Sequence, residues 1–181
     1  MEVIKTDFEG LYVVVPKVFG DNRGWFFESY TKERYESFGL VADFVQDNQS
    51  YSKEKGTIRG LHFQKNPMAQ LKLIRCTRGR IIDTVVDIRK NSPTYKKHFS
   101  IELSPENAKQ LWIPRGFAHG FVTLTEDCEI QYKVDNYYSP ECDRSIKYND
   151  PEFGIDWGVE NPVLSQKDIN APLLADSDAD F

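Results

Sequence analysis

The chain has 181 residues, of which 40% are hydrophobic and 13% aromatic, and this composition excludes an intrinsically disordered protein. Its length predicts one domain over residues 1–181. The net charge of -5 argues against a broad nucleic-acid-binding face, although a few well-placed arginines can still bind a small anion.

Neither the cysteines nor the first residues indicate an exported protein. Cys76, Cys128 and Cys142 form no close pair and no metal-binding spacing, so we expect reduced thiols. Residues 1–7 lack the apolar core of a signal peptide, and no apolar run approaches the length of a membrane-spanning helix. The sequence therefore predicts a cytoplasmic protein that binds neither nucleic acid nor membrane.

Short segments rich in β-branched and aromatic residues, separated by turn signals, run through most of the chain. We expect one helix at Lys32–Phe38, with Thr31 as its N-cap and Gly39 at its end. After Pro151 the strand signal fades, and residues from about 151 onward should form a tail that wraps the outside of a barrel. The many short strands favour an antiparallel sandwich or jelly roll. The expected strands are Leu11–Val15, Trp25–Tyr30, Phe44–Asn48, Thr57–Phe63, Leu71–Cys76, Arg80–Ile88, His98–Leu103, Gln110–Ile113, Phe117–Thr123 and Glu129–Asn136.

Two of the three histidines, His62 and His119, stand in glycine-rich phrases. Glycine lets the backbone bend or approach a ligand closely, and an imidazole can exchange a proton near neutral pH. Strand alternation places Arg59 on the face opposite His62 unless the strand bulges at Gly60, which is a natural bulge position. This pattern predicts a proton-transfer site, with Arg59 and His62 sharing a cavity if the bulge forms.

The same alternation identifies further candidates for the cavity. Lys72 lies between two leucines and is expected to face a polar interior, and Tyr132 lies on the apolar, inward face of its strand. A half-exposed position for Lys72 and simple core packing for Tyr132 are the alternatives. Asp83 and Asp87 share a face of a strongly apolar strand, and for Asp87 we favour an ion pair with Arg89.

Such a cavity suits the removal of a proton next to a carbonyl group. His62, with an ordinary pKa of ~6.5, would be the base. Lys72 would stabilise the enolate oxygen, and Tyr132 would return a proton on the opposite face and thereby invert the centre. No redox cofactor is needed. We also expect no metal, because Gln64 stands where metal-binding jelly rolls carry a second histidine.

Several phrases appear in a characteristic order. They are Phe19–Gly24, Val45–Asn48, Ile58–Gln64, Asp87–Arg89 with Ser92–Thr94, Ile113–Phe121, Tyr132-Lys133, Tyr137–Pro140 and Leu164–Asp168. Together they resemble the dTDP-4-dehydrorhamnose 3,5-epimerase family of the RmlC type, from about Gly10 to Leu174. The resemblance implies a mainly β, cupin-like double-stranded β-helix (jelly roll) with few short helices. It also implies a homodimer, no cofactor and no metal.

The implied activity is inversion at C3 and C5 of dTDP-4-keto-6-deoxy-D-glucose, giving dTDP-4-keto-L-rhamnose. This reaction belongs to dTDP-L-rhamnose biosynthesis, which supplies cell-surface polysaccharide.

The resemblance also implies roles by position. His62 matches the base, Asp168 the carboxylate that orients it, Tyr132 the acid and Lys72 the group near the C4 oxygen. Tyr138 matches an aromatic that stacks on the thymine. The other positions match substrate contacts, some of them supplied by the partner subunit: Arg23, Glu28, Gln46, Asp47, Asn48, Arg59, His119, Asp143 and Lys167.

The chain departs from the family pattern at Gln49, where His is frequent, at Leu71, where Gly is frequent, and at Asp143, where Glu is usual. Gln49 and Leu71 are expected near the pocket, so these two changes bear on substrate preference. Three alternatives to the 3,5-epimerase are a single-centre epimerase of a related nucleotide 4-keto-deoxysugar, a non-catalytic sugar-binding jelly roll, and a metal-dependent cupin oxygenase or isomerase.

Overall fold

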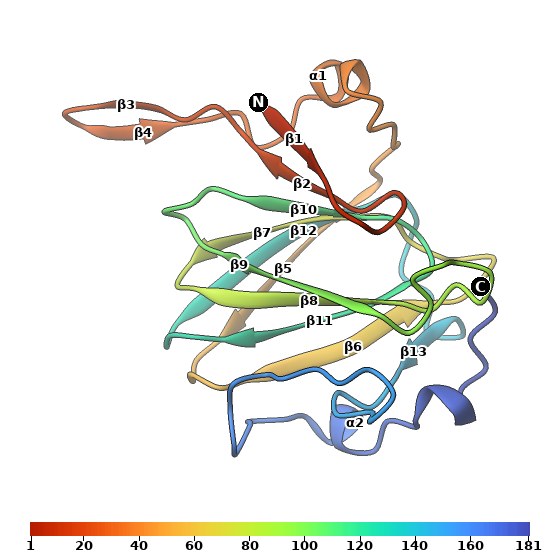
Figure 1. Cartoon of the computed structure of the whole chain (residues 1–181). Helices are drawn as coiled ribbons and strands as arrows, with labels where there is room; N and C mark the ends of the chain where they lie inside the picture. Colours follow the sequence, from red (N-terminus) through yellow and green to blue (C-terminus); the bar gives the residue numbers. More distant parts are fainter.

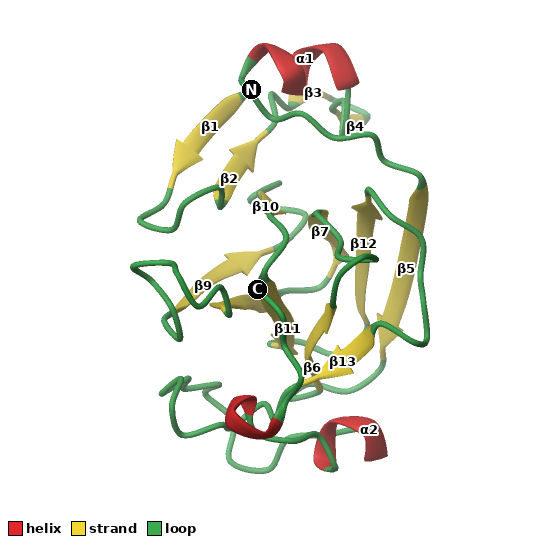
Figure 2. Cartoon of the chain, turned by 90° about the vertical axis from the view of Figure 1, so that its right-hand side faces the viewer, coloured by secondary structure: helices red, strands yellow, loops and turns green.

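Two antiparallel sheets face each other in the computed structural model, which describes all 181 residues (Figure 1, Figure 2). Most neighbouring strands are distant in sequence, as in a jelly roll, which confirms the expected fold. The six-stranded sheet has the order β1 (Glu2–Lys5), β2 (Tyr12–Val15), β10 (Gln110–Ile113), β7 (Lys72–Arg78), β12 (Cys128–Val134), β5 (Gln46–Ser52). The five-stranded sheet has the order β13 (Asp143–Ser145), β6 (Ile58–Gln64), β11 (Phe117–Thr123), β8 (Ile81–Asp87), β9 (His98–Leu103).

The remaining elements lie outside this roll. A hairpin of β3 (Phe19–Asp21) and β4 (Gly24–Phe26) projects from it (Figure 1). The helices are short: α1 (Lys32–Ser37), α2 (Gln166–Ile169) and a 3-10 turn at Leu174–Asp176. None of them is long or apolar enough to cross a lipid bilayer.

Apolar side chains fill three separate cores. The largest lies between the two sheets and includes Leu111, Val85 and Ile130. A second lies between the outer face of the five-stranded sheet and the C-terminal segment, where Leu61 and Phe63 of β6 belong to one cluster with residues such as Trp157. The third packs α1 against the outer face of the six-stranded sheet. Because β6 is buried on both faces, its alternate residues can face the interior of the roll.

β6 and β11 approach each other closely at two glycines. A Cβ atom on Gly60 would lie 2.5 Å from the Cα of Gly120, and a Cβ on Gly120 would lie 2.8 Å from the carbonyl oxygen of Arg59. The register shifts here, because His119 pairs with His62 whereas Phe121 pairs with Arg59. Three steps along β6 therefore match two along β11, which is the bulge expected at Gly60.

Element boundaries differ from the expected ones in several places. The segment Trp25–Tyr30 is not one strand, because β4 ends at Phe26. The strand expected at Phe44–Asn48 is displaced in the structure. The polar segment Gln46–Ser52 forms β5 instead, because it pairs with β12. Helix α1 forms where expected, but the side chain of Thr31 makes no capping hydrogen bond. β1, β3, β13 and α2 were not expected.

We predict that Gly60→Ala lowers the free energy of unfolding by about 2–4 kcal/mol, because the added Cβ meets backbone atoms and the residue has a positive φ. Gly154→Ala is the matched control. Gly154 also has a positive φ of 60°, but its Cβ would meet nothing within 4 Å, so it should lose only about 1 kcal/mol. Chemical denaturation measures both. Equal losses would show that the contact with β11 is not tight.

Candidate active site

A cavity of about 570 Å³ opens between the two sheets beside α2. Side chains from both sheets and from the C-terminal segment reach it. Those that carry chemistry are Arg59, His62, Gln64, Lys72, His119, Tyr132, Tyr138, Asp143, Ser165, Lys167 and Asp168. Residues from opposite ends of the sequence therefore meet at one place, and every one of the four expected catalytic groups lines it.

His62 stands on β6 at one wall of the cavity, with its side chain 32% exposed. Its Nε2 lies 2.6 Å from Oδ1 of Asp168, whose residue is 2% exposed. The other ring nitrogen, Nδ1, is left as the proton-accepting atom. Burial acts to raise the pKa of Asp168, but hydrogen bonds from His62 and Ser165 and the charge of Lys167 outweigh it and hold that pKa below its ordinary value. Asp168 is therefore an anion that orients the imidazole.

His119 lies beside His62, because the two are paired residues of adjacent strands and point to the same side. Its Nε2 is 2.9 Å from Oδ2 of Asp83, a fully buried carboxylate on the next strand, β8. Both histidines of the glycine-rich phrases are thus held by a carboxylate. The structure thus gives Asp83 a histidine partner, which the sequence analysis left undecided. Asp87 pairs with Arg89 at 2.8 Å, as expected.

Lys72 and Tyr132 stand on the opposite wall, on β7 and β12 of the six-stranded sheet. They are diagonal neighbours, because Tyr132 pairs with Ile74, two residues after Lys72. Desolvation in the cavity lowers the pKa of Lys72 to about 8, although Asp83 and Asp143 act to raise it. Burial raises the pKa of the Tyr132 hydroxyl, which therefore keeps its proton at neutral pH.

Polar and charged side chains continue from these walls to the rim. Lys167 of α2 forms an ion pair with Asp143 of β13, with 2.5 Å between Nζ and Oδ2. The hydroxyl of Tyr138 lies 3.5 Å from the same Oδ2, and Tyr138 is exposed. Arg59 reaches the cavity through the bulge and donates to the hydroxyl of Ser52. These groups give the rim both charge and an aromatic surface.

The other candidate residues lie outside this cavity. Arg23 is at the hairpin, where it pairs with Asp21, and Glu28 pairs with Arg34. Asp47 pairs with Lys133 on the outer face of the six-stranded sheet. Gln46 and Asn48 share a hydrogen bond of 2.8 Å on the edge strand β5. A single chain thus brings together most, but not all, of the candidate site residues.

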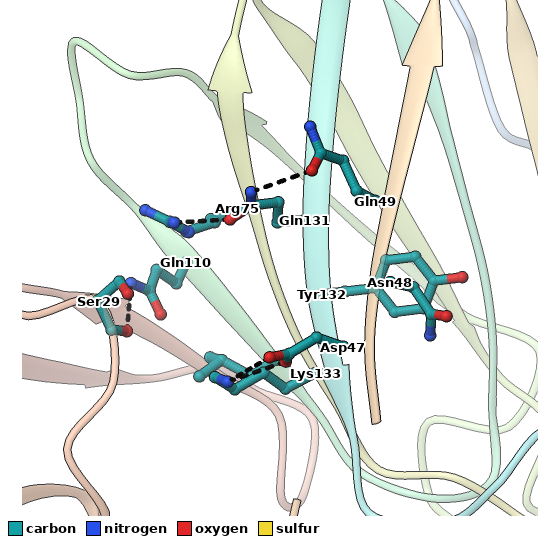
Figure 3. Close-up of a pocket in the computed structure, with 10 residues that line it drawn as sticks. Ser29, Asp47, Asn48, Gln49, Arg75, Gln110, Gln131, Tyr132 and Lys133 are labelled. Atoms are coloured by element: carbon teal, nitrogen blue, oxygen red, sulfur yellow. Dashed lines mark hydrogen bonds and ion pairs between the residues drawn. The ribbon is translucent and has the colours of Figure 1, made fainter. Parts of the chain in front are cut away.

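A second hollow of about 330 Å³ lies on the outer side of the six-stranded sheet (Figure 3). Arg75 donates to Gln131 there at 2.7 Å, and Lys133 to Asp47 at 2.8 Å. In Figure 3 the ring of Tyr132 points the other way. Strand alternation explains this, because residues 131 and 133 face outward when 132 faces the interior. Of the groups expected for proton transfer, only Tyr132 borders this hollow, and His62, Lys72 and Asp168 do not.

No three His, Cys, Asp or Glu side chains are grouped so that they could hold a metal ion. Sequence reasoning missed Asp83 and Ser165 as site residues. For Asp83 the available signal was a carboxylate within a buried strand. For Ser165 it was the pattern Ser-x-x-Asp, which is typical of a helix N-terminus.

The fold and the site together define a jelly-roll protein whose cavity holds a histidine–carboxylate pair on one wall and a lysine and a tyrosine on the other. Comparisons with known proteins agree with this class. The family model for dTDP-4-dehydrorhamnose 3,5-epimerase matches residues 5–176. The chain belongs to this family.

Individual relatives match over nearly their whole length. The dTDP-4-dehydrorhamnose 3,5-epimerase of Salmonella typhimurium is 53% identical over 96% of each chain. The crystal structure of the Bacillus anthracis enzyme with TDP and PPi bound has a TM-score of 0.93 and 52% identity, covering 95% of this chain and 98% of that one. The RmlC of Legionella pneumophila in complex with dTDP-4-keto-L-rhamnose also has a TM-score of 0.93, with 45% identity, covering 98% and 94%.

We predict that Lys72 titrates at about pH 8, apart from the other lysines. Nuclear magnetic resonance of the protein with carbon-13-methylated lysines measures this, and Lys72→Arg assigns the signal. Asp83→Asn should lower the pKa further, because the buried carboxylate favours the charged ammonium. Asp127→Asn, at a half-exposed carboxylate that pairs with Arg78, should leave it unchanged. A Lys72 signal that titrates with the bulk of the lysines would contradict desolvation in the cavity.

Proposed function

We propose that this protein is a dTDP-4-dehydrorhamnose 3,5-epimerase, which inverts C3 and C5 of dTDP-4-keto-6-deoxy-D-glucose and yields dTDP-4-keto-L-rhamnose. The observation that carries the proposal is the placement of His62 and Tyr132 on opposite sheets across one cavity. Facing sheets are about 10 Å apart, a distance that admits one sugar ring between base and acid. Removal of a proton on one side and its return on the other inverts the carbon.

The reaction follows from the acidity of the two carbons that flank the C4 keto group. Nδ1 of His62 takes the proton from the carbon, and the electron pair of the C–H bond becomes the enolate with its charge on the C4 oxygen. The ammonium of Lys72 stabilises that charge. Tyr132 then gives its hydroxyl proton to the opposite face. His62 releases its proton to solvent and Tyr132 regains one before the second carbon reacts, so no proton is gained or lost overall.

The protonation states suit this sequence of steps. Tyr132 must carry a proton at neutral pH, and burial supports this by raising its pKa. Lys72 must be charged, which holds below about pH 8. The contribution of Lys72 is therefore largely present in neutral solution and declines as the pH rises through that value.

The rim suits the nucleotide part of the substrate. Lys167 and Arg59 are cations that can hold the diphosphate, and the exposed ring of Tyr138 can stack on the thymine. Lys72 and His119 contact the sugar inside. Asp143 takes part at the rim through its pairing with Lys167.

The proposed assembly is a homodimer with substrate contacts from both subunits. Phe26 and Trp25 of the projecting hairpin are 65% and 62% exposed, more than a monomer usually leaves in contact with water. Arg23 and Glu28 adjoin these aromatics and lie outside their own cavity. If the hairpin packs on a second chain, it can deliver both to the partner's cavity, beside Gln46, Asp47 and Asn48 of β5. We place the reaction in the cytoplasm and in dTDP-L-rhamnose biosynthesis, without a cofactor.

We predict that deuterium enters both C3 and C5 when the protein acts on dTDP-4-keto-6-deoxy-D-glucose in deuterium oxide, because each inversion replaces one C–H bond by a bond to a solvent-derived atom. Proton nuclear magnetic resonance and mass spectrometry follow the label. Label at one carbon only would instead support a single-centre epimerase. Absence of exchange at both carbons would contradict the proposal.

We predict that Tyr132→Phe separates exchange from inversion. His62 can still remove the proton and return a solvent deuteron to the same face, so the substrate should gain label without inversion, with turnover to product reduced by about 100-fold or more. His62→Asn should abolish both exchange and inversion. Inversion at the wild-type rate in the Tyr132→Phe variant would remove Tyr132 from the mechanism.

A further inference from the structure

Ser165 lies directly behind the His62–Asp168 pair. Its hydroxyl is 2.7 Å from Oδ2 of Asp168, and Oδ1 of the same carboxylate is 2.6 Å from Nε2 of His62. A serine hydroxyl donates to a carboxylate, so each oxygen of Asp168 accepts a hydrogen bond from a different residue. The three side chains form one chain of hydrogen bonds that ends at the cavity.

The same hydroxyl oxygen is also the N-cap of α2, where it accepts from the backbone N–H of Asp168 at 3.1 Å. In a usual capping box the acidic residue at this position bonds back to the N–H of the capping residue. Here Asp168 instead directs its carboxylate toward the hydroxyl of Ser165 and toward His62. The short helix therefore leaves the carboxylate available for the imidazole.

We propose that Ser165 is a positioning residue of the epimerase, which fixes the rotation of the Asp168 carboxylate and thereby keeps Nε2 of His62 protonated and Nδ1 free to act as the base. This inference rests on the proposed function of His62. A hydrogen bond to a charged group contributes more than one between neutral groups, and geometry set by a second residue is what keeps a catalytic base aligned.

The pKa of Asp168 supports the same conclusion. Burial of this side chain favours the neutral acid, and hydrogen bonds from His62 and Ser165 are the main opposing influences. Loss of the Ser165 hydroxyl should therefore raise the pKa of Asp168.

The variants separate positioning from helix capping. Ser165→Ala removes both functions and should reduce kcat by about 10-fold with little change in KM, as expected for a lost charge-assisted hydrogen bond behind the base. Ser165→Thr keeps the hydroxyl and should restore kcat. Ser165→Asp keeps a good N-cap acceptor but donates no proton, so it should not restore kcat. Restoration by Ser165→Asp would mean that capping alone matters and would overturn the proposal.

A double-mutant cycle tests whether Ser165 acts through Asp168. In an Asp168→Asn background, Ser165→Ala should reduce kcat by less than 2-fold, because the carboxylate that it orients is gone. An undiminished 10-fold loss in that background would overturn the proposal.

Nitrogen-15 nuclear magnetic resonance of the histidines reads the protonated ring nitrogen of His62 without any turnover. The wild type should show the Nε2–H form, and Ser165→Ala should show a mixture of the two neutral forms. A pure Nε2–H form in both proteins would refute the positioning role. Because this measurement needs no substrate, it remains decisive even if the wild type fails to epimerise the nucleotide sugar, a result that would refute the proposed function alone.

Discussion

The close contact between Gly60 and Gly120 is the constraint on which the rest of the site depends. No side chain fits between β6 and β11 at this point, and the extra residue in β6 shifts the strand by one position. Side chains that would alternate between two faces are thereby brought to one cavity, so Arg59 and His62 share it. Without the bulge, one of the two would point toward the C-terminal segment.

The C-terminal segment adds Asp168 to the cavity that the bulge shapes. Asp168 is 106 residues from His62 in sequence and touches it because the segment packs on the outer face of the five-stranded sheet. Apolar side chains around Trp157 are buried by this packing, and their removal from water favours it. Asp178 ties the end of the segment to Arg144 and Lys65. A carboxylate as buried as Asp168 is costly unless it is hydrogen-bonded, so the packing and the catalytic pair require each other.

The sequence was informative where a pattern is local. Strand alternation placed Tyr132 toward the interior, and the glycine at position 60 indicated the bulge. Segments whose structure depends on distant partners were misjudged. The polar segment Gln46–Ser52 forms β5 only because β12 pairs with it, and β13 is short enough that pairing with β6 decides it. The contact between Asp83 and His119 could not be derived from the sequence. It depends on the order of strands in the sheet, and local alternation of residue types does not determine that order.

The resemblance to a known family placed residues that local patterns could not reach, notably Asp168 and Lys167. The resemblance does not explain why these residues lie close to His62 and Lys72. Their position follows from the packing of the C-terminal segment on the five-stranded sheet. It also named Arg23 and Glu28, and one chain alone does not bring them to the cavity.

The two walls of the cavity differ in how they set the protonation states of their side chains. On one wall, each histidine is held by a carboxylate, which fixes its orientation and leaves one ring nitrogen free. On the other wall, Tyr132 is held neutral by burial, and Lys72 retains enough anionic surroundings to remain charged below about pH 8. A proton can therefore leave one side of a ring and arrive from the other at neutral pH. The catalytic walls are complete within one chain, whereas the aromatic hairpin extends away from them. The charged and aromatic rim belongs to the same chain as both walls, and of the candidate residues Arg23 and Glu28 lie apart from it near the hairpin.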